Sequence, residues 1–110
     1  MSLPQGGSGN GLPANGPGSG TALSRIVTIP NRLGLHARAA AKFVSLAERF
    51  GASVEVVKDG QAVSARSIMG LMMLGAGKGA QIELRAEGWD AKEALEALTA
   101  LVEAGFHEQE

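Results

Sequence analysis

The sequence predicts an α+β fold, an open-faced two-layer β-sandwich in which three helices cover one face of a four-stranded, mainly antiparallel sheet. Three observations lead to it. Four short runs have the β-branched or alternating apolar residues of strands, three stretches place apolar residues at helical spacing, and an Asp59-Gly60 pair joins two of the strands. The predicted order is βαββαβα, and elements with a single apolar face pack as two layers.

The chain of 110 residues divides into a low-complexity start and one domain. Residues 1–21 are mostly Gly, Ser, Pro, Asn and Gln. Such a composition cannot bury enough apolar surface to offset the entropy of ordering. We therefore expect residues 1–21 to be a disordered Gly/Ser/Pro-rich tail and residues 22–110 to form the domain, which is small but long enough to fold alone.

Composition argues against several kinds of site. The chain has no cysteine and two histidines, so it has no disulfide framework and is a poor candidate for a multi-histidine metal site. We expect neither a metal nor a cofactor. The net charge of −1 gives no electrostatic reason for binding nucleic acid or an anionic membrane.

Membrane insertion and secretion are not expected either. No stretch approaches the roughly 20 apolar residues of a membrane span. The start of the chain also lacks the basic residues and the apolar core of a secretory signal. We therefore expect a cytoplasmic protein.

The first strand is predicted at residues 22–29, where a β-branched run is ended by Pro30. Pro30-Asn31 and Gly34 then form a turn that brings His36 to the start of a helix.

The first helix begins at Ala37, and we expect Gly51 to end it as a left-handed cap. Lys42, Glu48 and Arg49 are predicted to face outward. The inward apolar stripe consists of Ala40, Phe43, Val44, Ala47 and Phe50.

A β-hairpin follows the first helix. Its strands are predicted at residues 53–58 and 61–65, with Val63 as the main apolar residue of the second strand. Asp59 and Gly60 between them suit a two-residue turn, because both tolerate positive φ.

The second helix is predicted at residues 68–74, with Ser67 as its N-cap. Gly70 lies inside it and weakens it by about 1 kcal/mol relative to alanine. The residues expected on one side of this helix are Ile68, Leu71 and Met72.

A glycine-rich turn at residues 75–79 leads to the last strand, predicted at residues 81–86. Asp90 and Glu93 have the spacing of a capping box at the start of the final helix, which we expect to end near Gly105. Its inner face is marked by Ala91, Ala94, Leu95, Leu98, Leu101 and Val102.

His36 is the strongest candidate for chemistry, because it stands at a predicted helix start with Arg38 two residues later. The first turn of a helix has backbone N–H groups without intrahelical partners and the positive end of the helix dipole, so it favours anions. Neutral imidazole is a nucleophile near neutral pH. This arrangement suits the acceptance of a phosphoryl group. His107, beyond the last helix, is expected to be incidental.

Two motifs resemble a known family. The sequence Gly-Leu-His-Ala-Arg at residues 34–38 resembles the active-site motif of the HPr family, the histidine-containing phosphocarriers of the bacterial phosphotransferase system. The sequence Ser-Ile-Met-Gly at residues 67–70 resembles that family's second signature, around its regulatory serine. The resemblance spans residues 23–106 with both motifs in the right order and separation, and it implies the same open-faced β-sandwich.

The resemblance implies a phosphoryl carrier and not an enzyme. In the family, enzyme I is phosphorylated by phosphoenolpyruvate and passes the phosphoryl group to Nδ1 of the histidine that matches His36. The carrier then passes the group to a second protein, typically of the enzyme IIA type. Arg38 and the backbone amides of Ala37, Arg38 and Ala39 are expected to hold the phosphate oxygens.

One position departs from the family's pattern. Members usually have proline where this chain has Ala39; alanine keeps its N–H and favours the helix, so we expect the site to survive the change. Ala39 and the ending Glu-Ala-Gly-Phe at residues 103–106 look more like a regulatory, nitrogen-branch carrier than the sugar-uptake type. A purely regulatory carrier is therefore the first alternative.

Ser67 has two interpretations. Serine is a preferred N-cap, and this structural role alone would explain a serine at position 67. The resemblance adds regulatory phosphorylation by an HPr kinase/phosphorylase, and with it a second alternative, a binding module switched by Ser67 phosphorylation alone. A phosphate at a helix start is tolerated electrostatically, so its charge would act chiefly by repelling partners.

The second helix has more apolar residues than one inward stripe requires. We predict a docking patch for enzyme I and other partners beside His36, because exposed methionines adapt to several partners. The patch consists of Leu35, Ile68, Met69 and Met72, and for Met72 core filling is the preferred alternative. We expect the carrier to be a monomer.

Overall fold

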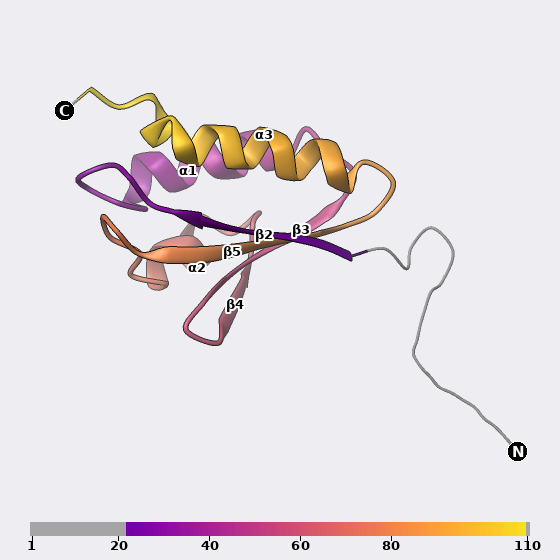
Figure 1. The fold of residues 1–110 in the computed structure, drawn as a ribbon, viewed down its shortest axis with the longest axis horizontal. Coiled ribbons are helices and arrows are strands. Elements are labelled where there is room, and N and C mark those ends of the chain that lie inside the picture. Colours follow the sequence, from indigo (N-terminus) through magenta and orange to yellow (C-terminus); the bar gives the residue numbers. More distant parts are fainter. Residues whose placement is uncertain (1–21, 110) are drawn as a thin grey trace, which may run out of the picture.

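The structure of the protein, a computed structural model, describes residues 22–109, and the expected tail at residues 1–21 lies outside them. The described chain has the predicted βαββαβα order followed by a short 3₁₀-helix (Figure 1). The elements are β2 (Ala22–Thr28), α1 (Ala37–Ala47), β3 (Ser53–Lys58), β4 (Gln61–Ser64), α2 (Ile68–Met73), β5 (Gln81–Glu87), α3 (Ala91–Glu103) and the 3₁₀-helix η1 (Gly105–His107).

The four strands form one antiparallel sheet in the order β2-β5-β3-β4. Val27 of β2 lies opposite Ile82 of β5, and Leu84 of β5 lies opposite Val56 of β3. These four side chains are buried. Because successive residues of a strand point to opposite faces, this register puts one apolar row under the helices.

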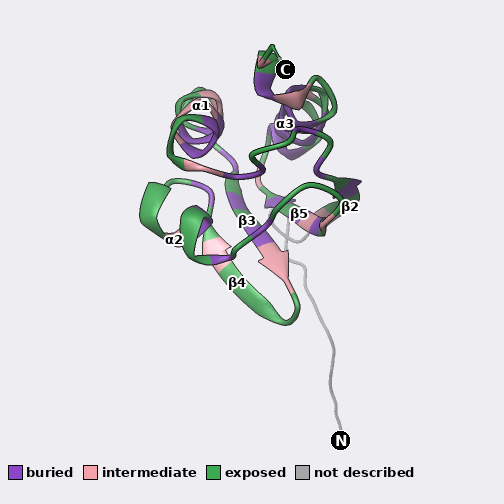
Figure 2. Ribbon diagram, turned by 90° about the vertical axis from the view of Figure 1, so that its left-hand side faces the viewer, coloured by how far each residue is buried: buried purple, intermediate pink, exposed green. Residues whose placement is uncertain are grey.

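The helices make the second layer, as predicted. In Figure 2, α1 and α3 lie side by side over one face of the sheet, and α2 lies beside α1 near β4. No helix within residues 22–109 has the length and apolar character of a membrane span. The largest fully buried side chains between the layers are those of Phe43, Phe106, Ile29, Leu71, Ile82, Leu84, Leu98, Val56 and Val102.

The β3–β4 hairpin turns as predicted. Asp59 and Gly60 both have positive φ, 51° and 81°, the conformation for which an Asp-Gly pair is favoured in two-residue hairpins.

The expected left-handed cap at Gly51 is wrong. The helix α1 ends at Ala47, its C-cap Glu48 has right-handed φ and ψ, and Gly51 is not among the glycines of positive φ. Three further residues bridge the helix end and Gly51 in turns. The apolar spacing extends through Phe50, which is half-buried. Periodicity therefore predicted a longer helix than the structure has.

The expected capping box of α3 is also wrong. The side chain of Asp90 makes no capping hydrogen bond to its own helix. Its two carboxylate oxygens instead accept hydrogen bonds from the backbone N–H groups of Gly51 and Ala52, each at 2.8 Å. The buried carboxylate therefore ties the start of α3 to the loop before β3, because it satisfies two amides that would otherwise lack partners.

The helix α2 has the predicted N-cap but not the predicted inward face. The Ser67 hydroxyl accepts a hydrogen bond from the Gly70 N–H at 2.9 Å. Of the three residues expected on one side, Leu71 is buried, whereas Ile68 and Met72 are exposed. The preferred interpretation of Met72 as core filling is therefore wrong.

Residues 105–109, which we call the C-terminal hook, turn back toward the start of α1. Gly105, Phe106 and His107 have consecutive positive φ values of 63°, 57° and 59°, a left-handed turn that only glycine adopts without strain. The Phe106 side chain is fully buried, and its carbonyl accepts a hydrogen bond from Lys42 Nζ at 2.7 Å. Lys42 thus reaches over to the hook and does not simply face outward.

Candidate functional site

His36 is positioned by a turn that only glycine can make. Gly34 has a φ of +67°, and a Cβ at this position would lie 2.3 Å from the carbonyl oxygen of Ala76. That carbonyl accepts a hydrogen bond from the Leu35 N–H at 2.9 Å. The buried Asn31 side chain donates to the Gly34 carbonyl at 3.0 Å. These contacts bind the turn to the loop before β5 and fix where α1 starts.

His36 is the N-cap of α1 and has extended backbone. Its carbonyl accepts the first helical bond, from the Ala40 N–H, but its imidazole makes no capping bond. Among the described residues, the N–H groups of Ala37, Arg38 and Ala39 have no hydrogen-bond partner. Three donors at a positive helix end therefore lie beside the imidazole, which is the arrangement that favours an anion.

The imidazole borders an open hollow of about 720 Å³ with a predominantly basic rim. Arg38 is exposed, and its guanidinium makes no hydrogen bond or ion pair with residues 22–109. The hollow is lined by Leu33, His36, Ala37, Arg38, Lys42, His107, Glu108 and Gln109. A free guanidinium beside unpaired amides suits the oxygens of a phosphate.

Glu108 contacts the candidate histidine directly, which the sequence did not predict. One carboxylate oxygen is hydrogen-bonded to His36 Nε2, and the other accepts from Asn31 Nδ2 at 3.0 Å. The hydrogen bond with His36 lowers the pKa of Glu108 from its ordinary 4.5; partial burial opposes the shift, and Asn31 and Lys42 reinforce it. No local sequence pattern predicts this contact. The only related feature in the sequence is that an aromatic residue and a carboxylate follow shortly after the last helix.

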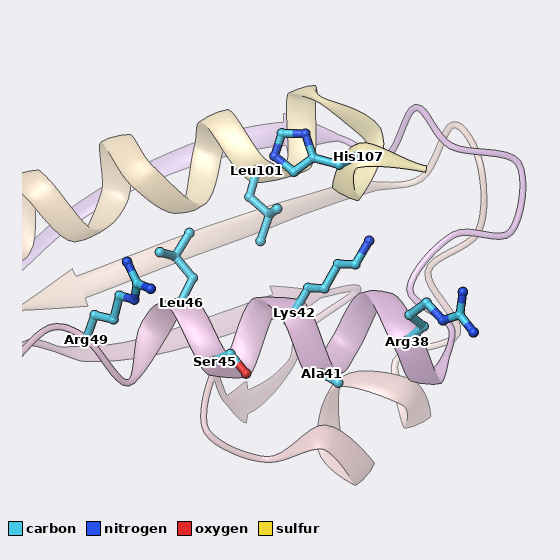
Figure 3. A pocket seen from close by; sticks show the side chains of 8 residues that line it. All are labelled: Arg38, Ala41, Lys42, Ser45, Leu46, Arg49, Leu101 and His107. Carbon is cyan, nitrogen blue, oxygen red and sulfur yellow. The ribbon is translucent and has the colours of Figure 1, made fainter. Parts of the chain in front are cut away.

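A second hollow of about 460 Å³ runs along α1 toward α3 (Figure 3). Leu46 and Leu101 give it an apolar middle, and Arg49 stands at one end. Lys42 extends from α1 toward the hook that carries His107, and both residues also line the first hollow. His107, expected to be incidental, thus lies at the rim of the site.

The predicted docking patch is exposed except at one residue. Met69 is 67% exposed, and Ile68, Met72 and Met73 are exposed too. Leu35 is 5% exposed, so its placement in the patch is wrong. It packs in the core beneath the site, because the Gly34 turn directs the chain inward there. Hereafter the docking patch means the four exposed residues of α2.

The described residues offer no obvious metal centre. His, Asp and Glu side chains nowhere gather in threes within residues 22–109. The acidic side chain at the imidazole, Glu108, is already held by Asn31.

Comparisons with known proteins agree with this geometry. The family model described as "PTS HPr component phosphorylation site" matches residues 23–104. The phosphocarrier protein HPr of Cupriavidus necator is 49% identical over 88 residues, which cover 80% of this chain and 99% of the relative. The phosphocarrier protein NPr of Shewanella violacea is 50% identical over 88 residues, covering 80% and 97%.

Solved structures show the same likeness. A crystal structure of HPr-C-His from Thermoanaerobacter tengcongensis has a TM-score of 0.77 at 44% identity and covers 80% of this chain and 99% of that one. An HPr dimer from the same organism has a TM-score of 0.64 at 48% identity, covering 74% and 94%. The match of fold, motif and length leads to one conclusion: the chain belongs to the HPr family of phosphocarrier proteins of the phosphotransferase system.

Proposed function

We propose that His36 accepts a phosphoryl group on Nδ1 from phosphorylated enzyme I and passes it to an acceptor of the enzyme IIA type. The observation that carries the proposal is the position of His36 at the start of α1, beside three amides without partners in residues 22–109. Phosphoryl transfer asks a protein mainly for positioning and for stabilisation of charge. The Gly34 turn positions the imidazole, and the amides at the start of α1 stabilise the negative charge.

Arg38 is proposed to hold phosphate oxygens together with the amides of Ala37, Arg38 and Ala39. Its side chain has no competing partner in the described chain, and its planar fork matches two phosphate oxygens. Ala39 keeps an N–H that a proline would lack, so this chain has one more donor at the helix start than members with proline there.

The docking patch on α2 is proposed to seat the protein partners. It consists of Ile68, Met69, Met72 and Met73. The helix α2 packs against α1, whose first residue follows His36, and the Leu35 N–H donates to the Ala76 carbonyl shortly after α2. The proposal is that a partner seated on the patch also contacts the imidazole. Exposed flexible methionines suit a surface that must accept a donor and an acceptor in turn.

Ser67 supports a regulatory alternative. Its hydroxyl caps α2 directly before Ile68 and Met69, so a phosphate there would place about two negative charges beside the docking patch. An HPr kinase/phosphorylase is the proposed modifying enzyme. Such a switch fits both a purely regulatory, nitrogen-branch carrier and a binding module that needs no histidine chemistry.

Phosphorylation by enzyme I separates a histidine carrier from a binding module that uses Ser67 alone. The chain is incubated with enzyme I and phosphoenolpyruvate, and its mass is measured before and after brief acid treatment. We expect an acid-labile gain of one phosphate that His36→Ala abolishes and that His107→Ala and Ser67→Ala retain. An acid-stable gain, or a gain that survives in His36→Ala, would contradict the carrier proposal. We further expect a cytoplasmic monomer, which fractionation and sedimentation measure.

A further inference from the structure

The Glu108 carboxylate is held in a fixed relation to the His36 ring. Asn31 Nδ2 donates to one oxygen at 3.0 Å and also to the Gly34 carbonyl at 3.0 Å, so the same buried amide orients the carboxylate and the turn before His36. The other oxygen meets His36 Nε2. The buried Phe106 two residues earlier anchors the hook that delivers Glu108.

The contact specifies which ring nitrogen carries the proton. An ionised carboxylate only accepts hydrogen bonds, so Nε2 must donate and therefore carries hydrogen. In a neutral imidazole the lone pair then lies on Nδ1. That is the nitrogen on which the proposed function places the phosphoryl group.

We infer that Glu108 is a positioning residue for phosphoryl transfer, which holds the His36 ring by its Nε2–H so that Nδ1 is presented as the nucleophile. This inference rests on the proposed function and names a residue of the C-terminal hook that acts through the histidine.

The charge changes during transfer favour the same role. The bond between Nδ1 and phosphorus forms as the bond between phosphorus and phosphorylated enzyme I breaks, and the donor keeps the bonding electron pair. Because Nε2 keeps its hydrogen throughout, the ring gains positive charge when Nδ1 is phosphorylated. The carboxylate of Glu108 lies against that ring and stabilises the charge as it develops.

Repulsion between Glu108 and the incoming phosphate is the opposing effect. Glu108 binds at Nε2, on the far side of the ring from the lone pair of Nδ1. Arg38 and Lys42 line the same hollow, so among the described lining residues two cations oppose the carboxylate of Glu108. Positioning is therefore expected to outweigh repulsion.

The test combines spectroscopy with kinetics on the full chain. The variants are Glu108→Ala, which removes the acceptor, Glu108→Gln, which keeps an oxygen acceptor without the charge, and Glu96→Gln, which removes one exposed carboxylate on α3. Proton NMR detects a ring N–H that is shifted downfield and protected from exchange by a carboxylate. His107, exposed and without a side-chain partner in residues 22–109, is the internal reference.

We expect a protected Nε2 proton at His36 in the unmodified protein and in Glu96→Gln, and its loss in Glu108→Ala. Phosphorylation by enzyme I should slow about tenfold in Glu108→Ala, by analogy with the lower end of the loss seen when a partner that orients a metal-binding histidine is removed. The phosphorylation rate of Glu108→Gln should lie between those of the unmodified protein and Glu108→Ala, since glutamine orients the ring without stabilising its charge.

Three results would overturn the inference: no protected proton in the unmodified protein, a proton that persists in Glu108→Ala, or equal or faster phosphorylation of Glu108→Ala. Faster phosphorylation would mean that Glu108 shields His36 from the donor. If the unmodified chain takes no phosphoryl group at all, the proposed function fails and this inference with it. If the unmodified chain and Glu108→Ala are phosphorylated at equal rates, the inference fails but the proposed function stands.

Discussion

At the scale of single residues, Gly34 shows how one missing side chain sets a site. Gly34→Ala forces a Cβ to within 2.3 Å of the Ala76 carbonyl at a φ of +67°. Gly75 has nearly the same φ, +64°, but open space around it. Alanine at Gly75 should therefore cost only the left-handed strain, about 1–2 kcal/mol, and Gly34→Ala about 1–3 kcal/mol more because backbone must shift.

Urea unfolding of the two glycine variants measures that difference. Gly34→Ala should also slow phosphorylation of His36, since the turn that carries it moves, whereas Gly75→Ala should not. Equal stabilities would show that the Ala76 contact relaxes freely and does not position the turn.

A pH dependence follows from the lowered pKa of Glu108. A carboxyl whose pKa is lower in the folded than in the unfolded chain stabilises the fold above its unfolded value, here near the ordinary 4.5. That contribution is lost as the pH falls through the lower folded pKa. The groups around this carboxylate are His36, Asn31, Lys42 and, along the neighbouring surface, Glu103.

We therefore expect the C-terminal hook to loosen in acid before the sheet unfolds. Hydrogen exchange of the His107 and Glu108 amides, which donate to the carbonyls of Ala104 and Gly105, should accelerate below about pH 4.5 relative to β5 amides. Glu108→Gln has no carboxyl to titrate, so its hook exchange should lack that step. An identical step in Glu108→Gln would assign the transition to another group.

Sequence reasoning could single out His36, Arg38 and Ser67 as candidates because the role proposed for each depends on its local setting. A histidine at a helix start, an arginine two residues on, and a serine before a helix are all readable within a few positions. Glu108 was not predicted because its partner His36 lies 72 positions away. Leu35 was misplaced because an apolar residue beside a motif does not reveal which way a glycine turn directs it.

At the scale of elements, the C-terminal hook depends on Phe106, whose side chain is fully buried. Phe106→Ala should lower the free energy of unfolding by about 3–5 kcal/mol, as for other buried phenylalanines. It should also remove the protected ring proton of His36, because Glu108 loses its anchor. Phe50→Ala, at a half-buried site after α1, is the control; it should cost less and keep that proton.

A protected proton that persists in Phe106→Ala would show that Glu108 and Asn31 hold the hook without the aromatic anchor. Denaturant unfolding monitored by circular dichroism measures the free energies of unfolding of Phe106→Ala and Phe50→Ala.

The docking patch can be tested against a residue of equal exposure on another surface. Met69 of α2 and Ile26 of β2 are both 67% exposed, but Ile26 lies on the sheet, away from the α2 patch. Met69→Ala should weaken binding of enzyme I by about 1 kcal/mol or more, roughly fivefold, while the fold stays intact. Ile26→Ala should leave the affinity unchanged, as titration calorimetry would measure. Equal effects would remove the patch from the mechanism.

Element types were predictable, but element ends were less so. The Asp59-Gly60 turn and the Ser67 cap were predicted correctly because local chemistry alone determines them. Gly51 and Asp90 were misread for a shared reason: the Gly51 amide is satisfied by the Asp90 carboxylate from 39 positions away. A tertiary hydrogen bond thus replaced both the expected left-handed cap and the expected capping box.

At the scale of the whole molecule, charge is unevenly distributed although the net charge is only −1. Arg38, Lys42 and Arg49 gather along the groove beside α1. Such clusters accelerate encounters with anionic groups and are screened by salt. Arg49→Glu should lower the association rate with phosphorylated enzyme I several-fold at low salt. Lys58→Glu, in the distant β3–β4 hairpin, should not.

Stopped-flow rates at two salt concentrations check this expectation, because the difference between Arg49→Glu and the unmodified chain should shrink as salt rises. A difference that is independent of salt would point to a packing contact of Arg49 and not to steering.

The order of the elements and the two-layer architecture were predictable because alternation and helical spacing each assign an apolar face, and two layers are the arrangement that buries all of them. The spatial strand order β2-β5-β3-β4 was not predicted, because periodicity assigns faces to strands but does not indicate which strands pair.

Within residues 22–109, the helices cover one face of the sheet and leave the other uncovered, which has a practical use. The site and the docking patch both lie on the helical side, and the chain contains no cysteine. A single cysteine introduced at Ser24, which is exposed on β2, would give one attachment point for a fluorophore remote from phosphoryl exchange. Such a labelled carrier would report each encounter with a donor or an acceptor in real time without a dye in the contact area.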